Sequence, residues 1–257
     1  MNQSSASETN AVLATIMNHR SIRKFKNIPL TTMQIEAIVR AAQMASSSRF
    51  MQAYSIIGLT DPALKHELSE ITKTPYMEEN GHLFIFCADL QRLTLMADEQ
   101  EKQEMRIMLG SSALYPIAVT DTALAAQNAV LAAESLGLGA VIMGSVTQDI
   151  RWLDRMLSLP DYVVPLFGVA VGVPDQQPEI KPRLPLEAVY FENCYPSERD
   201  LQAHIQAYDD DMRHYYQNRS GNNRNACWSR SHIELLKLPI PLDDMTEYLH
   251  GKGLNLT

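Results

Sequence analysis

Residues 115–139 read YPIAVTDTALAAQNAVLAAESLGLG, an alanine-rich run that predicts one long helix over Tyr115–Leu136. The many small side chains in this run let neighbouring backbones approach the helix closely. Gly137 and Gly139 follow, and glycine is the residue that most often ends a helix. We therefore expect a closely packed central helix around which the rest of the fold is built.

Shorter elements lie on both sides of this run along the chain. Helical spacing of apolar residues predicts helices, and short β-branched or aromatic runs between turn formers predict buried strands. Thr31 followed by Gln34 is the pattern of a capping box that begins a helix. The predicted helices are Ala11–Met17, the capped helix through Ala45, Pro62–Ile71 and Glu198–Tyr216, and the predicted strands are Tyr54–Leu59, Leu83–Ala88, one after Gly139, and Val163–Val171.

Length and composition favour a single folded domain. The chain has 257 residues, 46% of them apolar, which is enough to bury a full core. It has no repeat and no Gly/Ser linker, so we expect one domain over residues 1–257 with a C-terminal extension from about residue 190. The formal net charge of −8 argues against a protein that holds nucleic acid by non-specific electrostatics.

Cysteine usage and hydropathy indicate a cytoplasmic protein. Cys87, Cys194 and Cys227 are odd in number and widely spaced, which suggests neither a disulfide framework nor a zinc ribbon. No apolar run approaches the roughly 18 residues of a membrane span. The first ten residues are polar, unlike a signal peptide, so we expect no membrane partner.

Three clusters of basic residues stand out against this acidic background. The first is His19-Arg20-Ser21-Ile22-Arg23, which follows the first predicted helix. Guanidinium groups offer paired donors that match phosphate oxygens, and His and Ser add shorter hydrogen bonds. The alternative for this cluster is a solvated basic turn beside the carbonyls at a helix end.

The other two clusters lie in the C-terminal third of the chain. Lys181-Pro182-Arg183 places two cations on a stiff loop, and Arg219 and Arg224 belong to a flexible polar loop. Each of them taken singly is also compatible with an ordinary surface loop. Together with the first cluster, they favour an enzyme that binds one resident and one visiting phosphorylated cofactor.

Several other chemistries lack their motifs. Gly137, Gly139 and Gly144 follow a helix and precede a strand, the reverse of the order that a dinucleotide fingerprint requires. The serines at 46–48 lack a Gly-x-Ser-x-Gly elbow, and no His-Glu-x-x-His pair is present. The acidic run 209–211 would spread around a helix, so we interpret it as solvated surface and expect no metal site.

The order of these clusters resembles the nitroreductase superfamily, and specifically its branch of major oxygen-insensitive NADPH nitroreductases and flavin reductase P. The resemblance extends from about Val12 to Trp228. The motifs that carry it are His19–Arg23, Ser46–Ser48 with Gln52, Ala126–Asn128 through Glu134–Gly139, Lys181–Pro185 and Arg219–Arg224.

This resemblance implies an α+β fold with a small, mainly antiparallel sheet surrounded by helices. It further implies a homodimer that exchanges terminal segments and holds one FMN in each of two interface pockets. The residues that it assigns to the FMN phosphate and ribityl chain are His19, Arg20, Ser21 and Arg23, with Ser47 near the cofactor. Those assigned to the flavin ring and to completing the flavin site are Ile142, Met143, Gly144, Ser145, Lys181 and Arg183. Those assigned to the 2′-phosphate of NADPH are Arg219 and Arg224.

The activity that the resemblance implies is reduction of nitroaromatics, quinones or free flavin by NADPH through FMN. In this ping-pong cycle a hydride passes to the flavin and then to the acceptor, and the protein contributes position and electrostatics. No side chain is required as a nucleophile, so we assign no catalytic residue. The alternative is a protein that binds FMN, or senses its redox state, without turnover.

Overall fold

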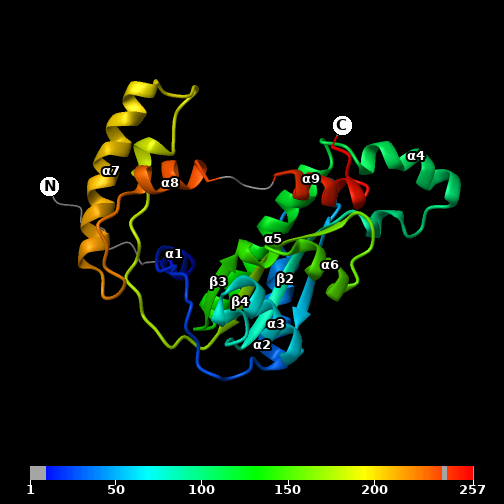
Figure 1. Cartoon of the computed structure of the whole chain (residues 1–257), viewed down its shortest axis with the longest axis horizontal. Helices are drawn as coiled ribbons and strands as arrows, with labels where there is room; N and C mark the ends of the chain where they lie inside the picture. The colour runs from blue at the N-terminus through cyan, green and yellow to red at the C-terminus, as the bar shows by residue number, and fades with distance from the viewer. Residues whose placement is uncertain (1–9, 239–241, 257) are drawn as a thin grey trace. The chain divides into compact units, whose positions relative to one another are not determined.

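The computed structural model describes residues 10–238 and 242–256 (Figure 1). Within it the chain forms two compact units, residues 1–177 with 242–257, and residues 178–241. We call them the first and second units and describe each by itself. The expectation of one domain with a C-terminal extension stays a prediction.

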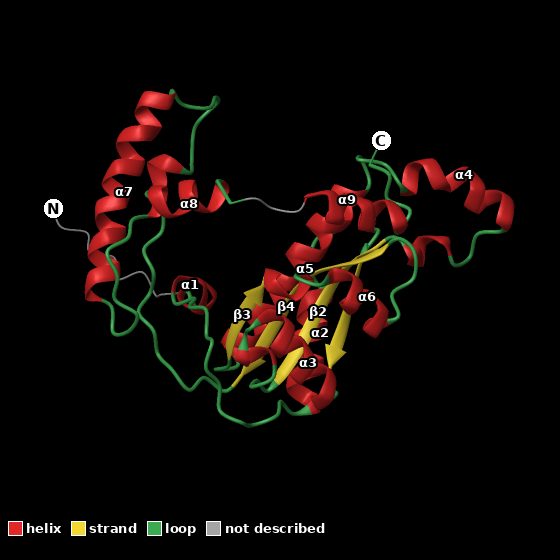
Figure 2. Ribbon diagram, in the orientation of Figure 1, coloured by secondary structure: helices red, strands yellow, loops and turns green. Residues whose placement is uncertain are grey.

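The first unit contains a four-stranded sheet (Figure 2). Its strands are β1 (Tyr54–Leu59), β2 (His82–Asp89), β3 (Gly139–Met143) and β4 (Val163–Gly172), in the order β1-β2-β4-β3. All three neighbouring pairs are antiparallel. Strands β1, β2 and β4 agree with their predicted ranges to within one residue at each end, and β3 is the strand expected after the glycines. The small antiparallel sheet is confirmed.

Alternate residues of β2 face two different cores because side chains in a strand point to opposite faces in turn. Phe84 and Phe86 pack into one cluster, while Leu83, Ile85 and Cys87 pack into another. Helices α2 (Thr32–Gln43) and α5 (Tyr115–Ser135) supply the first cluster, and α3 (Pro62–Thr72) and α6 (Ile150–Leu157) the second. The sheet is therefore covered by helices on both faces.

Helix α5 confirms the predicted central helix. Its small residues Ala125, Ala126, Ala129 and Ala133 are almost completely buried, and the helix packs against α2 and the sheet. The capping box at Thr31 is also present, with the Gln34 N–H donating to its hydroxyl. Helix α2 ends at Gln43 rather than at the expected Ala45, since the Met44 and Ala45 N–H groups already close tighter turns.

Proline accounts for an irregularity in the sheet. Pro165 lies opposite Cys87, and the pairing of β2 with β4 slips by one residue between Phe86 and Cys87. Because proline has no N–H to give to the ladder, it is tolerated beside such a bulge. This bulge lies near the beginning of β4, where the sequence places the proline.

Other helices were not predicted from the sequence. They are α4 (Glu99–Leu109), α6, α8 (Trp228–Leu236) and α9 (Leu242–Gly251), while α1 (Ala11–Met17) agrees with its prediction. Helix α9 belongs to the first unit, where buried Lys252 just beyond it contacts Asp154 at 2.8 Å. The Tyr248 hydroxyl donates to the same carboxylate at 2.6 Å, so Asp154 anchors the C-terminal helix.

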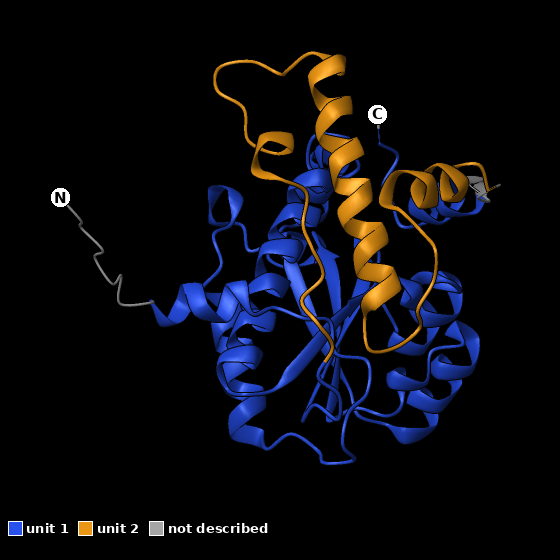
Figure 3. Cartoon of the chain, turned by 90° about the vertical axis from the view of Figure 1, so that its left-hand side faces the viewer, with its two compact units in different colours: residues 1–177, 242–257 blue, residues 178–241 orange. Residues whose placement is uncertain are grey.

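The second unit is built on helix α7 (Glu198–Asn218), with α8 beside it (Figure 3). Its own small core consists of Tyr208, Met212 and Tyr216, with Leu184 and Trp228 packed against them. The acidic run on α7 is solvated at two of its three positions. Asp209 instead accepts the Ser229 N–H at 2.8 Å in the first turn of α8, which corrects the prediction for that residue.

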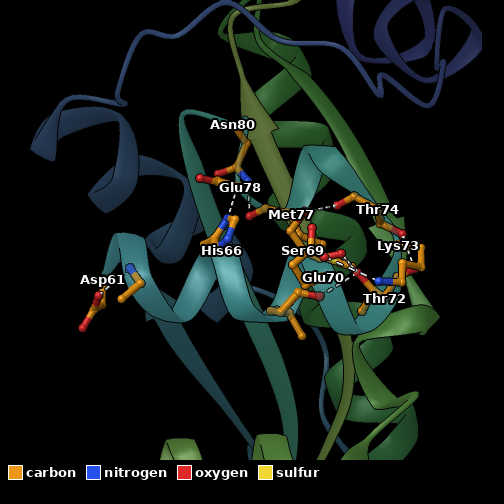
Figure 4. A network of polar contacts seen from close by, with 12 residues as sticks. Asp61, His66, Ser69, Glu70, Thr72, Lys73, Thr74, Met77, Glu78 and Asn80 are labelled. Carbon is orange, nitrogen blue, oxygen red and sulfur yellow. Dashed lines mark hydrogen bonds and ion pairs between the residues drawn. The ribbon is translucent and has the colours of Figure 1, made fainter.

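A polar network closes the turn between α3 and β2 (Figure 4). The Asn80 amide donates to the Met77 carbonyl at 2.9 Å, and His66 contacts Glu78 at 2.9 Å. The Ser69 hydroxyl donates to the Thr74 carbonyl at 3.2 Å. The remaining short helical turns of the chain are Ser48–Phe50, Pro75–Met77, Gln91–Thr94, Gly144–Thr147 and Leu186–Ala188.

Candidate functional site

A cavity of about 770 Å³ in the first unit lies where the segment after α1 passes the end of α5. We call it the amino-terminal pocket. The segment is fixed by main-chain pairing, because the Ile22 N–H donates to the Ala140 carbonyl at 3.0 Å. The lining residues are Ala14, Thr15, Asn18, Arg20, Ile22, Lys26, Glu134, Gly137–Gly139 and Pro174–Gln177.

Arg20 carries an unsatisfied donor at this pocket. Its side-chain Nε is the one buried side-chain polar atom, among residues 10–238 and 242–256, that has no hydrogen-bond partner. Leaving a buried donor of a charged group unpaired costs at least ~1–3 kcal/mol, so such atoms usually mark a place for a ligand. Lys26 adds a second positive charge to the same lining. The carboxylates of Glu134 and Asp175 also line the pocket, but they contact His19 and Lys24, so an acceptor group would fit at the unpaired donor of Arg20.

The other residues of the first basic cluster have different surroundings. His19 Nδ1 lies 2.6 Å from Glu134 Oε1, and this glutamate lines the pocket. Ser21 pairs with Ala140 in a parallel bridge, and Arg23 is exposed. Because successive side chains of an extended segment alternate in direction, Arg20 and Ile22 line the pocket whereas Ser21 and Arg23 do not.

Ser47 lies in a backbone segment that is held in an unusual conformation. Arg49, Phe50 and Gln52 have φ values of 50°, 57° and 51°, in the left-handed region that non-glycine residues seldom adopt. The Gln52 N–H donates to the Ser47 hydroxyl at 3.2 Å. Such strain collects at functional sites and persists only where the surroundings impose it.

Helix α5 supplies the side chain that imposes this left-handed backbone conformation. Asp121, only 1% exposed, accepts the N–H groups of Ser48 and Ala53, one on each side of the strained residues. A second cavity, of about 480 Å³, is lined by Ser46–Ser48 and by Asp121. Sequence reasoning missed Asp121, although an acid within an otherwise alanine-rich helix was a signal that could have identified it.

The residues predicted to follow the flavin ring lie at the end of edge strand β3. Ile142 is 46% exposed in a strand that is otherwise buried, and the space beside Gly144 is open. Ser145 is half-buried in the short helical turn that follows. Met143 points the other way and packs in the core of the first unit. Ile142 and Gly144 therefore present an open, mostly apolar surface.

Three of the four predicted cations of the second unit lie around one aromatic ring. Arg224 Cζ lies 4.4 Å from the centroid of the Tyr216 ring, Arg219 Cζ 4.9 Å, and Lys181 Nζ 5.5 Å. Arg183 is exposed, and its guanidinium donates to the Lys181 carbonyl at 3.1 Å. The structure thus brings together cations from two separate loops, and Tyr216 at their centre was not predicted.

The charges alter the acidity of that tyrosine. Burial alone would raise the pKa of Tyr216, but hydrogen bonds from Lys181 and Arg224, together with their charges, lower it below its ordinary value. Glu179 lies beside this group, and its carboxylate accepts the Ser220 N–H at 2.9 Å. The second unit therefore concentrates positive charge on a helix end.

No group of three or more metal-ligating side chains occurs among the described residues. Among the helices that the structure describes, none is both long and apolar enough to cross a bilayer.

Comparison with known protein families gives two matches that together cover most of the chain. Residues 16–173 match the nitroreductase family, and residues 181–257 match the C-terminal domain of the nitroreductase family. The boundary between the two matches lies close to the boundary between the two units at residue 177.

Individual proteins are similar over almost the whole chain. FMN reductase (NADPH) of Bacillus subtilis is 41% identical over 96% of this chain and 99% of its own length. The structure of NfrA1 nitroreductase from B. subtilis has a TM-score of 0.89 and 40% identity, covering 94% of this chain and 98% of that one. NADPH:FMN oxidoreductase from Vibrio harveyi, solved with NAD⁺, has a TM-score of 0.84 and 35% identity, covering 95% and 98%.

Proposed function

The chain belongs to the nitroreductase family of oxidoreductases, and from this membership we propose that it is an FMN-dependent enzyme that oxidises NADPH and reduces small acceptors. The observation that carries the proposal is the unpaired, buried Nε of Arg20 at a pocket of about 770 Å³. A phosphate monoester supplies the acceptor that this guanidinium lacks. The names of the relatives, FMN reductase (NADPH) and NADPH:FMN oxidoreductase, support the same cofactor and reductant.

The residues around the amino-terminal pocket fit an FMN phosphate. Arg20 would bind the phosphate oxygens, with Lys26 adding positive charge and Asn18 a neutral donor. His19 is oriented by Glu134 through Nδ1, and its other ring nitrogen would accept a hydrogen bond from a ribityl hydroxyl. Ser21 and Arg23 do not line this pocket, and their proposed contacts to the ribityl chain and phosphate rest on the family resemblance.

Other residues would hold and orient the rest of the cofactor. FMN, when bound, supplies two-electron chemistry by accepting a hydride equivalent from NADPH and passing it to a second substrate. Ile142 and Gly144 leave an open surface for a flat ring, and Ser47, which the resemblance assigns to the flavin site, is fixed by the strained segment. Lys181 and Arg183 would place positive charge near the flavin ring, and this charge would favour the negatively charged reduced form of the flavin.

We assign the 2′-phosphate of NADPH to Arg219 and Arg224. Their guanidinium groups lie on the same tyrosine ring and on one short loop, which suits a doubly charged group. NADPH should therefore be preferred over NADH. The acceptors that we propose are nitroaromatics, quinones and free flavin, because the protein supplies position and charge rather than a side chain that reacts.

We further propose a homodimer in which terminal segments are exchanged and which places the basic clusters around each cofactor. An apolar cavity of about 570 Å³ lies between α1, α2 and α5. It is lined by exposed Val12 and Met44, and such patches mark protein interfaces. The proposed location is the cytoplasm, because the three cysteines are free thiols in the structure.

The test is to purify the protein and mix it with NADPH without oxygen. An enzyme of this kind is yellow, loses the flavin absorption rapidly on addition of NADPH, and regains it when a quinone is added. A yellow protein that does not bleach would support the alternative, a non-catalytic FMN-binding or redox-sensing protein. A colourless protein that FMN cannot reconstitute would contradict both.

A further inference from the structure

Tyr216 occupies a special place in the second unit. It lies near the end of α7, is 6% exposed, and packs in the small core with Tyr208 and Met212. Its neighbour Tyr215 is only half-buried, and the two rings meet edge to face with their centroids 5.5 Å apart. The helix therefore fixes the ring of Tyr216 before any ligand is present.

Three positive charges converge on this ring from two loops. Lys181 precedes α7 by 17 residues, whereas Arg219 and Arg224 follow it. Their distances from the ring centroid, 4.4 to 5.5 Å, are within the roughly 6 Å at which a cation is attracted to the face of an aromatic ring. Three cations so close together repel each other, and the ring and its hydroxyl oxygen offset part of that repulsion.

Main-chain bonds hold the second loop against the same helix end. The Arg219 N–H donates to the Tyr215 carbonyl at 3.0 Å, and the Arg224 N–H donates to the Tyr216 carbonyl at 3.1 Å. Glu179 accepts from the Ser220 N–H and hydroxyl between these two arginines. Both arginines are consequently held on one side of the loop, with Tyr216 beneath them.

The arrangement is suited to a ligand rather than to stability alone. Lys181 and Arg224 are exposed, and no ion pair is present for either of them or for Arg219 among the described residues. The Arg219 guanidinium donates to the Asn222 carbonyl of its own loop. Exposed cations normally spread into solvent, where each is fully hydrated. A doubly charged phosphate monoester would neutralise the group without moving it.

We propose that Tyr216 is a positioning residue that assembles Arg219 and Arg224 into one binding site for the 2′-phosphate of NADPH. This inference rests on the proposed function and deepens it, because it identifies what sets the preference for NADPH over NADH. The fixed ring holds the cations together in the free enzyme, so less conformational freedom is lost when the phosphate binds. Lys181 also contacts the ring of Tyr216 but keeps its proposed place at the flavin.

The experiment measures binding of adenosine 2′,5′-bisphosphate and of AMP to the FMN-loaded enzyme by calorimetry. AMP is the matched probe because it lacks only the 2′-phosphate. Tyr216→Leu should lower the affinity for the bisphosphate by about tenfold or more, since it removes three cation–π contacts. Tyr216→Phe keeps the ring but loses the hydroxyl, and it should lower the affinity for the bisphosphate by about threefold. Affinity for AMP should stay unchanged in both.

Steady-state kinetics provide the second readout. Both variants should raise KM for NADPH, Tyr216→Leu more than Tyr216→Phe. The value of kcat and the KM for NADH should stay unchanged. Tyr215→Leu is the control, because the Tyr215 ring is adjacent but makes no contact with the three cations, and its main-chain bond with Arg219 is kept in the variant. If Tyr216→Leu fails to fold, as judged by FMN content and thermal unfolding, Tyr216→Phe still tests the inference.

The outcomes separate the inference from the function on which it rests. Unchanged bisphosphate affinity in Tyr216→Phe and Tyr216→Leu would overturn the inference, and so would equal losses for the bisphosphate and AMP. If wild-type enzyme bleaches with NADPH in either of those cases, the proposed function survives. If wild-type enzyme does not bleach with NADPH, the proposed function fails whatever the binding data show.

Discussion

The carboxylate of Asp121 accepts the main-chain N–H of Ser48 through Oδ1 at 3.0 Å. Its second oxygen accepts the N–H of Ala53 at 3.2 Å. Between these two anchors lie the residues with left-handed backbone angles. One buried side chain from the central helix thus determines the shape of the segment that carries Ser47.

Replacing Asp121 should destabilise the protein and loosen this segment. Asp121→Ala leaves the buried Ala53 N–H and the part-buried Ser48 N–H without their acceptor, and we expect the free energy of unfolding to fall by about 2–4 kcal/mol. Denaturant unfolding of the FMN-free protein measures the loss. The control is Thr120→Ala, at an exposed position on the same helix. Equal losses in the two variants would show that Asp121 does not act as a clamp.

Arg20→Ala should weaken FMN binding without destabilising the FMN-free protein. The substitution removes a charged donor that is unpaired without a ligand, so the free energy of unfolding should stay the same or rise. The dissociation constant of FMN should increase by about tenfold to a hundredfold, because charge-assisted bonds to phosphate are lost. Fluorescence titration measures it.

Arg23→Ala is the matched variant for that experiment, since Arg23 is exposed and does not line the amino-terminal pocket. We expect a smaller effect on FMN binding from it than from Arg20→Ala. A larger effect from Arg23→Ala would assign the phosphate to the other side of this segment.

Loss of both loop arginines should remove the preference for NADPH. Arg219→Ala combined with Arg224→Ala should raise KM for NADPH by about a hundredfold, since two charge-assisted contacts are lost, and leave KM for NADH nearly unchanged. Arg230→Ala is the control, because Arg230 is exposed in the same unit and pairs with Glu234 at 2.8 Å. Equal changes for the two dinucleotides would remove these residues from 2′-phosphate recognition.

Stability should fall at high pH because of Cys87. Burial, followed by the nearby Asp89 and Asp154 charges, raises the pKa of this thiol from 9.0 to about 12. Between these values the unfolded chain loses the proton while the folded chain keeps it, so unfolding is favoured as pH rises. The slope should be about 1.4 kcal/mol per pH unit.

Cys87→Ala should abolish this contribution to the slope between pH 9 and 11, although it also lowers stability at pH 7 by opening a small cavity.

At pH 8, a thiol reagent should label exposed Cys194 and leave Cys87 unmodified until the protein unfolds. Mass spectrometry of the labelled peptides measures how far each of these two cysteines is modified. Rapid labelling of Cys87 in the folded protein would contradict its burial.

Local patterns were sufficient for much of the fold. Helical spacing, a capping box at Thr31 and short β-branched runs act within a few residues, so the ends of β1, β2 and α5 were predicted closely. Helix α9 was not predicted, since what holds it is its contact with Asp154, which lies about ninety residues earlier in the chain.

The basic clusters were likewise evident from composition alone, but their roles were not. Arg20 and Arg23 are equivalent in a sequence, as are Tyr215 and Tyr216. The alternation of an extended segment and the burial of one helix face placed Arg20 at a pocket and Tyr216 among three cations. The sequence by itself determined which charges the chain carries and which segments form helices and strands. Only the tertiary structure decided which of those charges meet, because long-range packing sets the direction of each side chain.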